Sequence, residues 1–252
     1  IKKFNKKKVP SNKSIAGKES IYGQMPDWNP AEIIGRTPRL MAYSLYKKII
    51  TDDIWALARK KMGYKNLENN SLMVSFAHQP FVDVRLSLNS FLPNTLDNKI
   101  SKKIINFYIK NLIKKPELHD KIEFKVGITC FSFDINERIK NLIGNTISLE
   151  EKKILIEKYR DHFQKFFTSF EGSILQAKSQ INILENRQQK YKSFKFYSEQ
   201  DKIKLLISDC KKLGTLPFSI LARHAFISKT ILDSFVFKKI LSEKESSSIQ
   251  AG

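Results

Sequence analysis

The stretch LMVSFAHQPFVDVRLSL (residues 72–88) decides the fold class of this chain. Apolar side chains occupy every second position on both sides of the turn-forming sequence His78-Gln79-Pro80. A period of two is typical of strands that bury one face and leave the other face polar. We therefore predict two antiparallel strands here, and a similar alternation over residues 122–131 predicts a third.

Helical patterns occupy most of the remaining sequence. Ser148 precedes Glu151 at the spacing of a capping box, which indicates a helix start. Apolar residues recur every three or four positions in four long segments, 100–114, 148–184, 198–214 and 215–237. Gly172 indicates a bend in the second segment, and Gly214 indicates the end of the third. We predict an α+β fold that is predominantly α-helical, with a small antiparallel sheet of about three strands.

The two ends of the sequence differ in composition from its middle. Residues 1–20 are basic and show no apolar periodicity, which predicts a linker or arm. Residues 243–252 are polar, and we expect a disordered tail there. The length of 252 residues suits one large domain, which we place at residues 21–242.

The chain is strongly basic, with 45 Lys and Arg against 25 Asp and Glu and a formal net charge of +20. Lysine outnumbers arginine and is spread along the whole sequence. Specific contacts with phosphate and bases rely on arginine, because its planar guanidinium bonds two acceptors at once. We therefore favour a solvated basic surface, and the alternative is a module that binds nucleic acid or another polyanion.

Several classes of protein are excluded by what the sequence lacks. The only cysteines, Cys130 and Cys210, exclude a disulfide framework and a cysteine-rich metal site, and they suit a reducing compartment. No run of about 18 apolar residues occurs, so we expect a cytoplasmic protein that does not cross a membrane. The histidines lack the spacing of metal ligands, and no glycine-rich nucleotide motif is present. We therefore predict no metal site and assign no catalytic residue.

Three polar clusters remain as candidate binding sites. The first comprises Asp27, Asn29, Glu32 and Arg36. Asn29 and Glu32 have the spacing of a capping box around Pro30. Local helix capping and a ligand-binding role therefore both remain open for this cluster.

The second cluster lies along the polar side of the predicted second strand and comprises Asp83, Arg85, Ser87 and Asn89, with Ser90 just after it. One interpretation is a solvated sheet face. The other is a surface for a polar zwitterion, in which Arg85 binds a carboxylate and Asp83 binds an ammonium group. The sequence alone leaves both interpretations open.

The third cluster is the pair Arg223-His224. His224 falls on the apolar stripe of its helix, where a histidine is more often a hydrogen-bonded core residue than a functional one. A part in substrate binding is the alternative that we keep for both residues.

Five segments of the sequence resemble the middle region of phosphoenolpyruvate synthase-like, or PEP-utilising, phosphotransferases. They are GQMPDWNPAEIIG (23–35), LYKKIITDDIWALARKKMGY (45–64), LMVSFAHQPFVDVRLSLNSFLP (72–93), PELHDKIEFKVGITCFSFD (116–134) and CKKLGTLPFSILARHAFI (210–227). The resemblance covers most of residues 21–237, and it implies a site made of Asp27, Asn29, Glu32, Arg36, Asp83, Arg85, Asn89, Ser90, Arg223 and His224. The chain has neither an ATP-grasp signature nor a glycine-rich threonine–histidine carrier loop, so it resembles the central domain alone.

The resemblance implies a function for the predicted domain. Members of this family are similar in layout to dikinases, in which an ATP-grasp domain and a swivelling phosphohistidine domain flank a domain for the phosphoryl acceptor. Residues 21–242 would then bind the acceptor, while ATP and Mg²⁺ would bind elsewhere in the full enzyme. The chain is similar to the L-glutamine kinases of capsular phosphoramidate biosynthesis, which implies that glutamine is phosphorylated while ATP yields AMP and phosphate. This segment alone would be inactive, and a non-catalytic docking domain is a further alternative.

Overall fold

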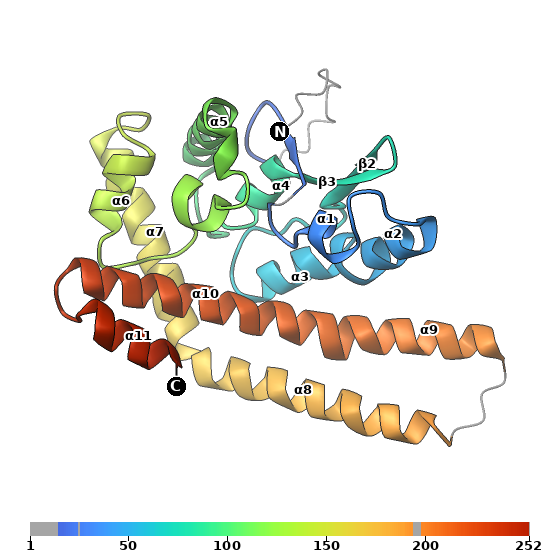
Figure 1. The fold of residues 1–252 in the computed structure, drawn as a ribbon. Coiled ribbons are helices and arrows are strands. Elements are labelled where there is room, and N and C mark those ends of the chain that lie inside the picture. The colour runs from blue at the N-terminus through green and yellow to red at the C-terminus, as the bar shows by residue number, and fades with distance from the viewer. Residues whose placement is uncertain (1–14, 25, 194–197, 252) are drawn as a thin grey trace.

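The structure is a computed structural model that describes residues 15–24, 26–193 and 198–251. It is mostly helical and, within these ranges, contains one small three-stranded antiparallel sheet (Figure 1). The predicted fold class is therefore confirmed. No helix in the described ranges combines the length and the apolar character needed to span a membrane.

The sheet has the strand order β1-β3-β2, formed by β1 (Tyr22–Gly23), β2 (Met73–Phe76) and β3 (Gln79–Asp83). The hairpin predicted from residues 72–88 is present as β2 and β3, which pair antiparallel. Its two-residue turn, Ala77-His78, has positive φ at both positions, 48° and 62°. This is the backbone of a type I′ turn, whose twist matches that of the flanking strands.

Two details of the predicted sheet are wrong. The second strand ends at Asp83, and the helix α4 (Val84–Asn89) follows, because the Asp83 carboxylate accepts the Leu86 backbone N–H at 3.1 Å and caps a helix there. All six residues of α4 are buried, so the alternation of polar and apolar residues does not report a one-sided strand. Residues 122–126 form the π-helical segment η3 (Ile122–Val126), and the third strand is β1 instead.

The N-terminal half contains a series of short helices. They are α1 (Pro30–Ile33), α2 (Leu40–Tyr46), the π-helical segment η1 (Lys47–Thr51) and α3 (Ile54–Lys61). The amphipathic pattern of residues 100–114 corresponds to α5 (Asn98–Lys114), which is followed by a short 3-10 turn, η2 (Pro116–Leu118), and by α6 (Ile135–Leu142).

The long helical pattern from Ser148 is divided into α7 (Leu149–Thr168) and α8 (Phe170–Tyr191). The capping box of Ser148 and Glu151 is confirmed by both of its hydrogen bonds. The break lies at Ser169 and not at Gly172, because the Ser169 hydroxyl lies within bonding distance of the carbonyl oxygens of Lys165 and Phe166 at the end of α7. Such back-bonding by serine competes with the regular helix ladder.

The helix that starts after Ser198 does not end at Gly214. Instead, α9 (Glu199–Asp209), the π-helical segment η4 (Cys210–Thr215) and α10 (Leu216–Phe237) follow without a break and form one rod beside α8 (Figure 1). Gly214 lies inside the π-helical segment, and Pro217 falls in the first turn of α10, where proline is tolerated. The Gly-Pro signal thus marks a change of helical pitch rather than a helix end.

Both ends of the chain differ from expectation. The expected disordered tail contains helix α11 (Glu243–Ala251), which starts with a capping box because Ser242 and Glu245 exchange side-chain and backbone hydrogen bonds. Residues 1–14 of the predicted arm lie outside the described residues. The rest of the arm is packed, since Ala16 is buried and its N–H and C=O both bond the Asn89 amide, at 2.8 and 2.9 Å.

The main core lies among α4, α5, α6 and α7, where Leu88, Ile104, Ile139 and Leu155 are fully or nearly fully buried. A second cluster packs α3 against β3 and α4. Helix α4 therefore lies between two apolar clusters, and its position fixes the polar side chains that point from it toward α3.

Candidate functional site

A cavity of about 470 Å³ lies where the loop before α1 meets α3, α4, η3 and α10. We call it the first cavity. Its polar lining includes three residues of the first predicted cluster, Asp27, Asn29 and Glu32, together with Arg223 of the third. Segments that are far apart in the sequence thus bring residues of all three predicted clusters together, because Ser87 of the second cluster also lines the cavity.

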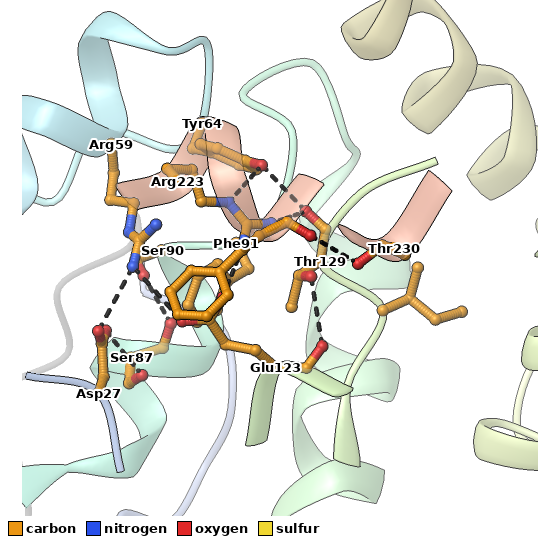
Figure 2. A network of polar contacts seen from close by, with 12 residues as sticks. Asp27, Arg59, Tyr64, Ser87, Ser90, Phe91, Glu123, Thr129, Arg223 and Thr230 are labelled. Carbon is orange, nitrogen blue, oxygen red and sulfur yellow. Dashed lines mark hydrogen bonds and ion pairs between the residues drawn. The ribbon is translucent and has the colours of Figure 1, made fainter. Parts of the chain in front are cut away.

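The floor of the first cavity is held by Arg223, whose side chain is 1% exposed. Its Nε donates to the Tyr64 hydroxyl at 3.0 Å, its Nη2 donates to the Thr129 carbonyl at 2.8 Å, and its Nη1 forms an ion pair with Glu123 (Figure 2). Tyr64 in turn donates to the same Thr129 carbonyl at 3.0 Å. All three nitrogens of this guanidinium are engaged, so Arg223 acts as a structural support of the floor.

Arg59 on α3 lies near Arg223 and makes fewer hydrogen bonds than Arg223 does. Its Nη2 donates to Asp27 Oδ1 at 3.4 Å and lies 3.9 Å from Glu123 Oε1. The other Asp27 oxygen accepts the Ser87 hydroxyl at 3.1 Å. Within the described part of the chain we find no further hydrogen bond from the Arg59 side chain, although a guanidinium carries five N–H donors. Arg59 therefore has donors available for a ligand in the first cavity.

The aromatic ring of Phe91 lies against both guanidinium groups. The Cζ atom of Arg59 is 4.3 Å from the ring centroid, and that of Arg223 is 4.9 Å from it (Figure 2). A ring face attracts cations, and the carboxylate of Glu123 lies between the two guanidinium groups, so the like charges are held close together. The Arg59 group is thereby fixed in one orientation.

Burial and charge act in opposite directions on the pKa values of the floor. Burial raises the pKa of Glu123 above its usual value, while Arg223 and Arg59 hold it down. Burial would lower the pKa of Arg223, but Tyr64 and Glu123 raise it by more, so this guanidinium stays charged. Burial also raises the pKa of Tyr64, which keeps its hydroxyl protonated and able to donate.

The loop that borders the first cavity is strained. Asp27, Trp28 and Asn29 have φ values of 49°, 59° and 33°, three successive residues in a region that disfavours side chains with a Cβ atom. The Tyr46 hydroxyl holds the loop by donating to the Trp28 carbonyl, and the Trp28 ring packs 6.2 Å from that of Phe218. Strain of this kind is concentrated at functional sites in proteins.

The predicted capping box at Asn29 is absent. Asn29 occupies the N-cap position of α1, but its left-handed backbone prevents a side-chain cap. Its Nδ2 donates instead to the Glu32 carboxylate at 3.2 Å, at the mouth of the cavity. Glu32 and Asp120, which also lines the mouth, are both exposed. The mouth therefore carries negative charge.

Asp83, Arg85, Asn89 and Ser90 of the second predicted cluster lie outside the first cavity, whereas Ser87 lines it. Asp83 caps α4 and accepts the Ser20 hydroxyl, and burial raises its pKa. Arg85 donates to the Gly17 carbonyl at 3.2 Å. Asn89 holds the Ala16 backbone, and Ser90 donates to the Ser87 carbonyl at 2.7 Å. Asp83, Arg85 and Asn89 attach residues 15–20 to the body of the protein. All four residues are buried, so the idea of a solvated sheet face does not apply to them.

Two other predicted residues face different hollows. Arg36 is exposed and lines a separate hollow together with Gln79 and His119. His224 lines a second cavity, of about 220 Å³, on the other side of α10 from Arg223. The third predicted cluster is thus divided between two cavities.

Arg59 and Glu123 are the functional candidates that sequence reasoning missed. Arg59 belongs to the basic run Arg59-Lys60-Lys61, where nothing in the sequence distinguishes it from its solvated neighbours. Glu123 lies in a segment that was predicted to be a strand, with this residue on the polar face. Ser87, which also lines the first cavity, was included in the second predicted cluster with Asp83 and Arg85.

Comparisons of the chain with protein-family models, with curated proteins and with solved structures give no match. The site is therefore interpreted from its own chemistry. In the described ranges, no three His, Cys, Asp or Glu side chains are grouped in a way that would hold a metal ion. What the first cavity offers is a guanidinium with unused donors, several carboxylates and an aromatic rim.

Proposed function

We propose that the first cavity binds the phosphoryl acceptor of an ATP-dependent, dikinase-type phosphotransferase, and that this acceptor is L-glutamine. The observation that carries the proposal is the buried guanidinium of Arg59, which is fixed in orientation and retains unused donors beside a carboxylate-lined mouth. Such a combination suits a small zwitterion. A volume of about 470 Å³ lies within the usual range for small-molecule sites.

Each end of the amino acid has a partner in this arrangement. Arg59 binds the α-carboxylate with its free donors, and Glu32 at the mouth binds the α-ammonium group. Arg223 does not touch the ligand; it holds Glu123 and thereby keeps Arg59 in place. The side-chain amide of glutamine then points away from the floor, toward the open side from which a phosphoryl group can arrive.

The resemblance of the sequence to PEP synthase-like enzymes supplies the reaction class. The phosphoryl group is carried by a histidine of a separate domain, and ATP and Mg²⁺ bind outside this chain. The contribution of the present domain is positional, because phosphoryl transfer depends mainly on alignment and on charge stabilisation. A role in the synthesis of capsular phosphoramidate follows from the same resemblance.

The charge of the lining disfavours a polyanion as the ligand of the first cavity. The lining contains the four carboxylates of Asp27, Glu32, Asp120 and Glu123 and the two guanidinium groups of Arg59 and Arg223. Carboxylates repel phosphate, and both guanidinium groups already face acidic partners. The net charge of +20 therefore does not extend into this cavity.

Calorimetric titration of the chain with L-glutamine tests the proposal. We expect saturable binding that weakens about tenfold or more in Arg59→Met and in the surface variant Glu32→Gln, since each loses a charged hydrogen bond. Arg36→Met, which removes an exposed arginine outside the first cavity, serves as the control and should bind like the unmodified chain.

A second ligand sharpens the assignment of Arg59. L-Glutaminamide lacks the α-carboxylate, so it should bind the unmodified chain weakly and lose no further affinity in Arg59→Met. The proposal is refuted if glutamine shows no saturable binding, or if Arg36→Met weakens binding as much as Arg59→Met does.

A further inference from the structure

The second cavity, on the opposite side of α10 from Arg223, has a different chemical character. It has a volume of about 220 Å³, which is small for an organic cofactor and large enough for a tetrahedral oxyanion. Its polar lining consists of two lysines, two histidines, one aspartate, one asparagine and hydroxyl groups from α7, α8 and the loop after α4. Most of these groups are hydrogen-bond donors.

Lys61 and Lys165 supply the charge of the second cavity. Lys61 lies at the end of α3, and Lys165 lies on α7, so separate elements bring the two ammonium groups to one hollow. In the described ranges, neither ammonium group has an ion pair or a hydrogen bond with another residue. Asp161, the single carboxylate of the lining, lies 3.8 Å from Lys158 and is partly neutralised by it.

The two histidines add no charge at neutral pH. The His162 Nε2 donates to the Met62 carbonyl at 2.8 Å, and burial lowers the pKa of His162 to about 4. Burial also lowers the pKa of His224, whose ring packs between Phe166 and Phe170. The positive charge of the second cavity therefore comes from the two lysines alone.

His224 lies within hydrogen-bond distance of Ser173, a second residue that lines the cavity. His224 is 4% exposed, its Nε2 lies 3.0 Å from the Ser173 hydroxyl oxygen, and its Nδ1 has no partner among the described residues. A neutral imidazole carries one N–H. When that proton is on Nε2, His224 donates to Ser173, and the Ser173 hydroxyl proton is free to point into the cavity.

We propose that the second cavity is a binding site for a phosphate group, in which Lys61 and Lys165 neutralise the charge and Ser173 donates a hydrogen bond. Two lysines match the charge of a phosphate at neutral pH, and hydroxyl donors match its remaining oxygens. Helical spacing supports the geometry, because His162 and Lys165 lie three positions apart on one face of α7. The site is separate from the glutamine site and does not depend on that proposed function.

The test uses inorganic phosphate and glycerol 3-phosphate as probes, in calorimetric titrations of the chain at low ionic strength. We expect saturable binding of phosphate, and glycerol 3-phosphate shows whether an ester is also accepted. Lys61→Met and Lys165→Met should each weaken binding about tenfold, because each removes a charge-assisted hydrogen bond. Both lysines are exposed, so these variants should fold normally.

Lys153→Met is the matched control, because Lys153 is an exposed lysine on the same helix, α7, and lies outside the second cavity. This variant should bind phosphate within about twofold of the unmodified chain, since the charge it removes is screened at the surface. The proposal is overturned if neither probe binds saturably, or if Lys153→Met weakens binding as much as Lys61→Met does, since the attraction would then be diffuse. Unchanged glutamine binding in Lys61→Met keeps the result separate from the first cavity.

Discussion

Replacement of Arg223 by methionine tests the polar network beneath the first cavity. The substitution leaves the Glu123 carboxylate without its main partner and the Thr129 carbonyl with one donor fewer. Removing one member of a buried ion pair destabilises a protein by about 3–5 kcal/mol. Since Arg223 is 1% exposed and three of its nitrogens are engaged, we expect a loss of about 4 kcal/mol in the free energy of unfolding.

A double-mutant cycle separates the ion pair from simple packing. Glu123→Gln alone keeps an acceptor for Arg223 and should cost about 1–2 kcal/mol. In the double variant no uncompensated carboxylate remains, so the combined loss should be smaller than the sum of the single losses by more than about 1 kcal/mol. Urea unfolding at pH 7, followed by tryptophan fluorescence and circular dichroism, measures all four proteins.

Arg39→Met removes an exposed arginine that precedes α2; it provides the control and should change stability by less than about 0.5 kcal/mol. The reasoning is refuted if Arg223→Met costs less than about 1 kcal/mol, or if the two substitutions add within about 0.5 kcal/mol. Either result would mean that Glu123 and Arg223 are not energetically coupled in the folded protein.

Three further predictions concern the scaffold around the cavities. The pKa of His162 is about 4 in the folded protein and lower than in the unfolded chain, so the unfolded chain takes up a proton first as the pH falls. The free energy of unfolding should therefore decrease by about 2 kcal/mol between pH 7.5 and pH 5. In urea titrations, a His162→Gln variant should lack this part of the decrease. Ser148→Ala removes the N-cap of α7 and should cost about 1 kcal/mol, whereas a thermal unfolding curve identical to that of the unmodified chain would contradict the cap. The substitutions Ala77→Asn and His78→Gly place residues that tolerate positive φ in the hairpin turn and should stabilise the protein by about 1 kcal/mol; a lower melting temperature would contradict the type I′ turn.

The sequence predicted the helices and strands that carry a clear local signal, such as an apolar stripe on one face or a capping box. Helix α5 has an apolar stripe against the core, α7 has a complete capping box, and the β2–β3 hairpin alternates cleanly, so all three were identified. The pattern failed at α4, where every side chain is buried and the polar side chains bond residues 15–20 and Asp27. The periodic spacing of apolar residues identifies an element that has one buried and one exposed face. A helix that is buried on all sides lacks this spacing.

The π-helical segments were the second obstacle. Residues 122–126 and 210–215 each carry signals that normally indicate a strand or a helix end, and in both cases the chain forms a wide helical turn. This matters for the site because η3 carries Glu123 to the floor of the first cavity. Sequence signals for π-turns are weak, since the turn depends on tertiary packing rather than on local propensity.

The part of the candidate site that the sequence predicted consists of residues that are close together both in sequence and in space. Asp27, Asn29 and Glu32 are close in sequence and remain close in space, so their grouping followed from the sequence. Arg59 and Glu123 are 64 positions apart, and only the packing of α3 against η3 and α10 places them within 3.9 Å. No local pattern encodes such a contact.

The pair Arg223-His224 shows how one helix supports two different sites. Neighbouring residues of an α-helix point about 100° apart, so Arg223 faces the first cavity and His224 faces the second. Tyr64 forms part of the wall between them, because its hydroxyl bonds Arg223 while its ring lies 4.4 Å from the ring of His162. Burial raises the pKa of Tyr64 and lowers the pKa of His162, so both side chains are neutral near pH 7. The pKa of Arg223 is raised, so its guanidinium stays charged. The carboxylates of the first cavity and the lysines of the second therefore lie on different sides of α10, so the two linings differ in charge although one helix contributes to both.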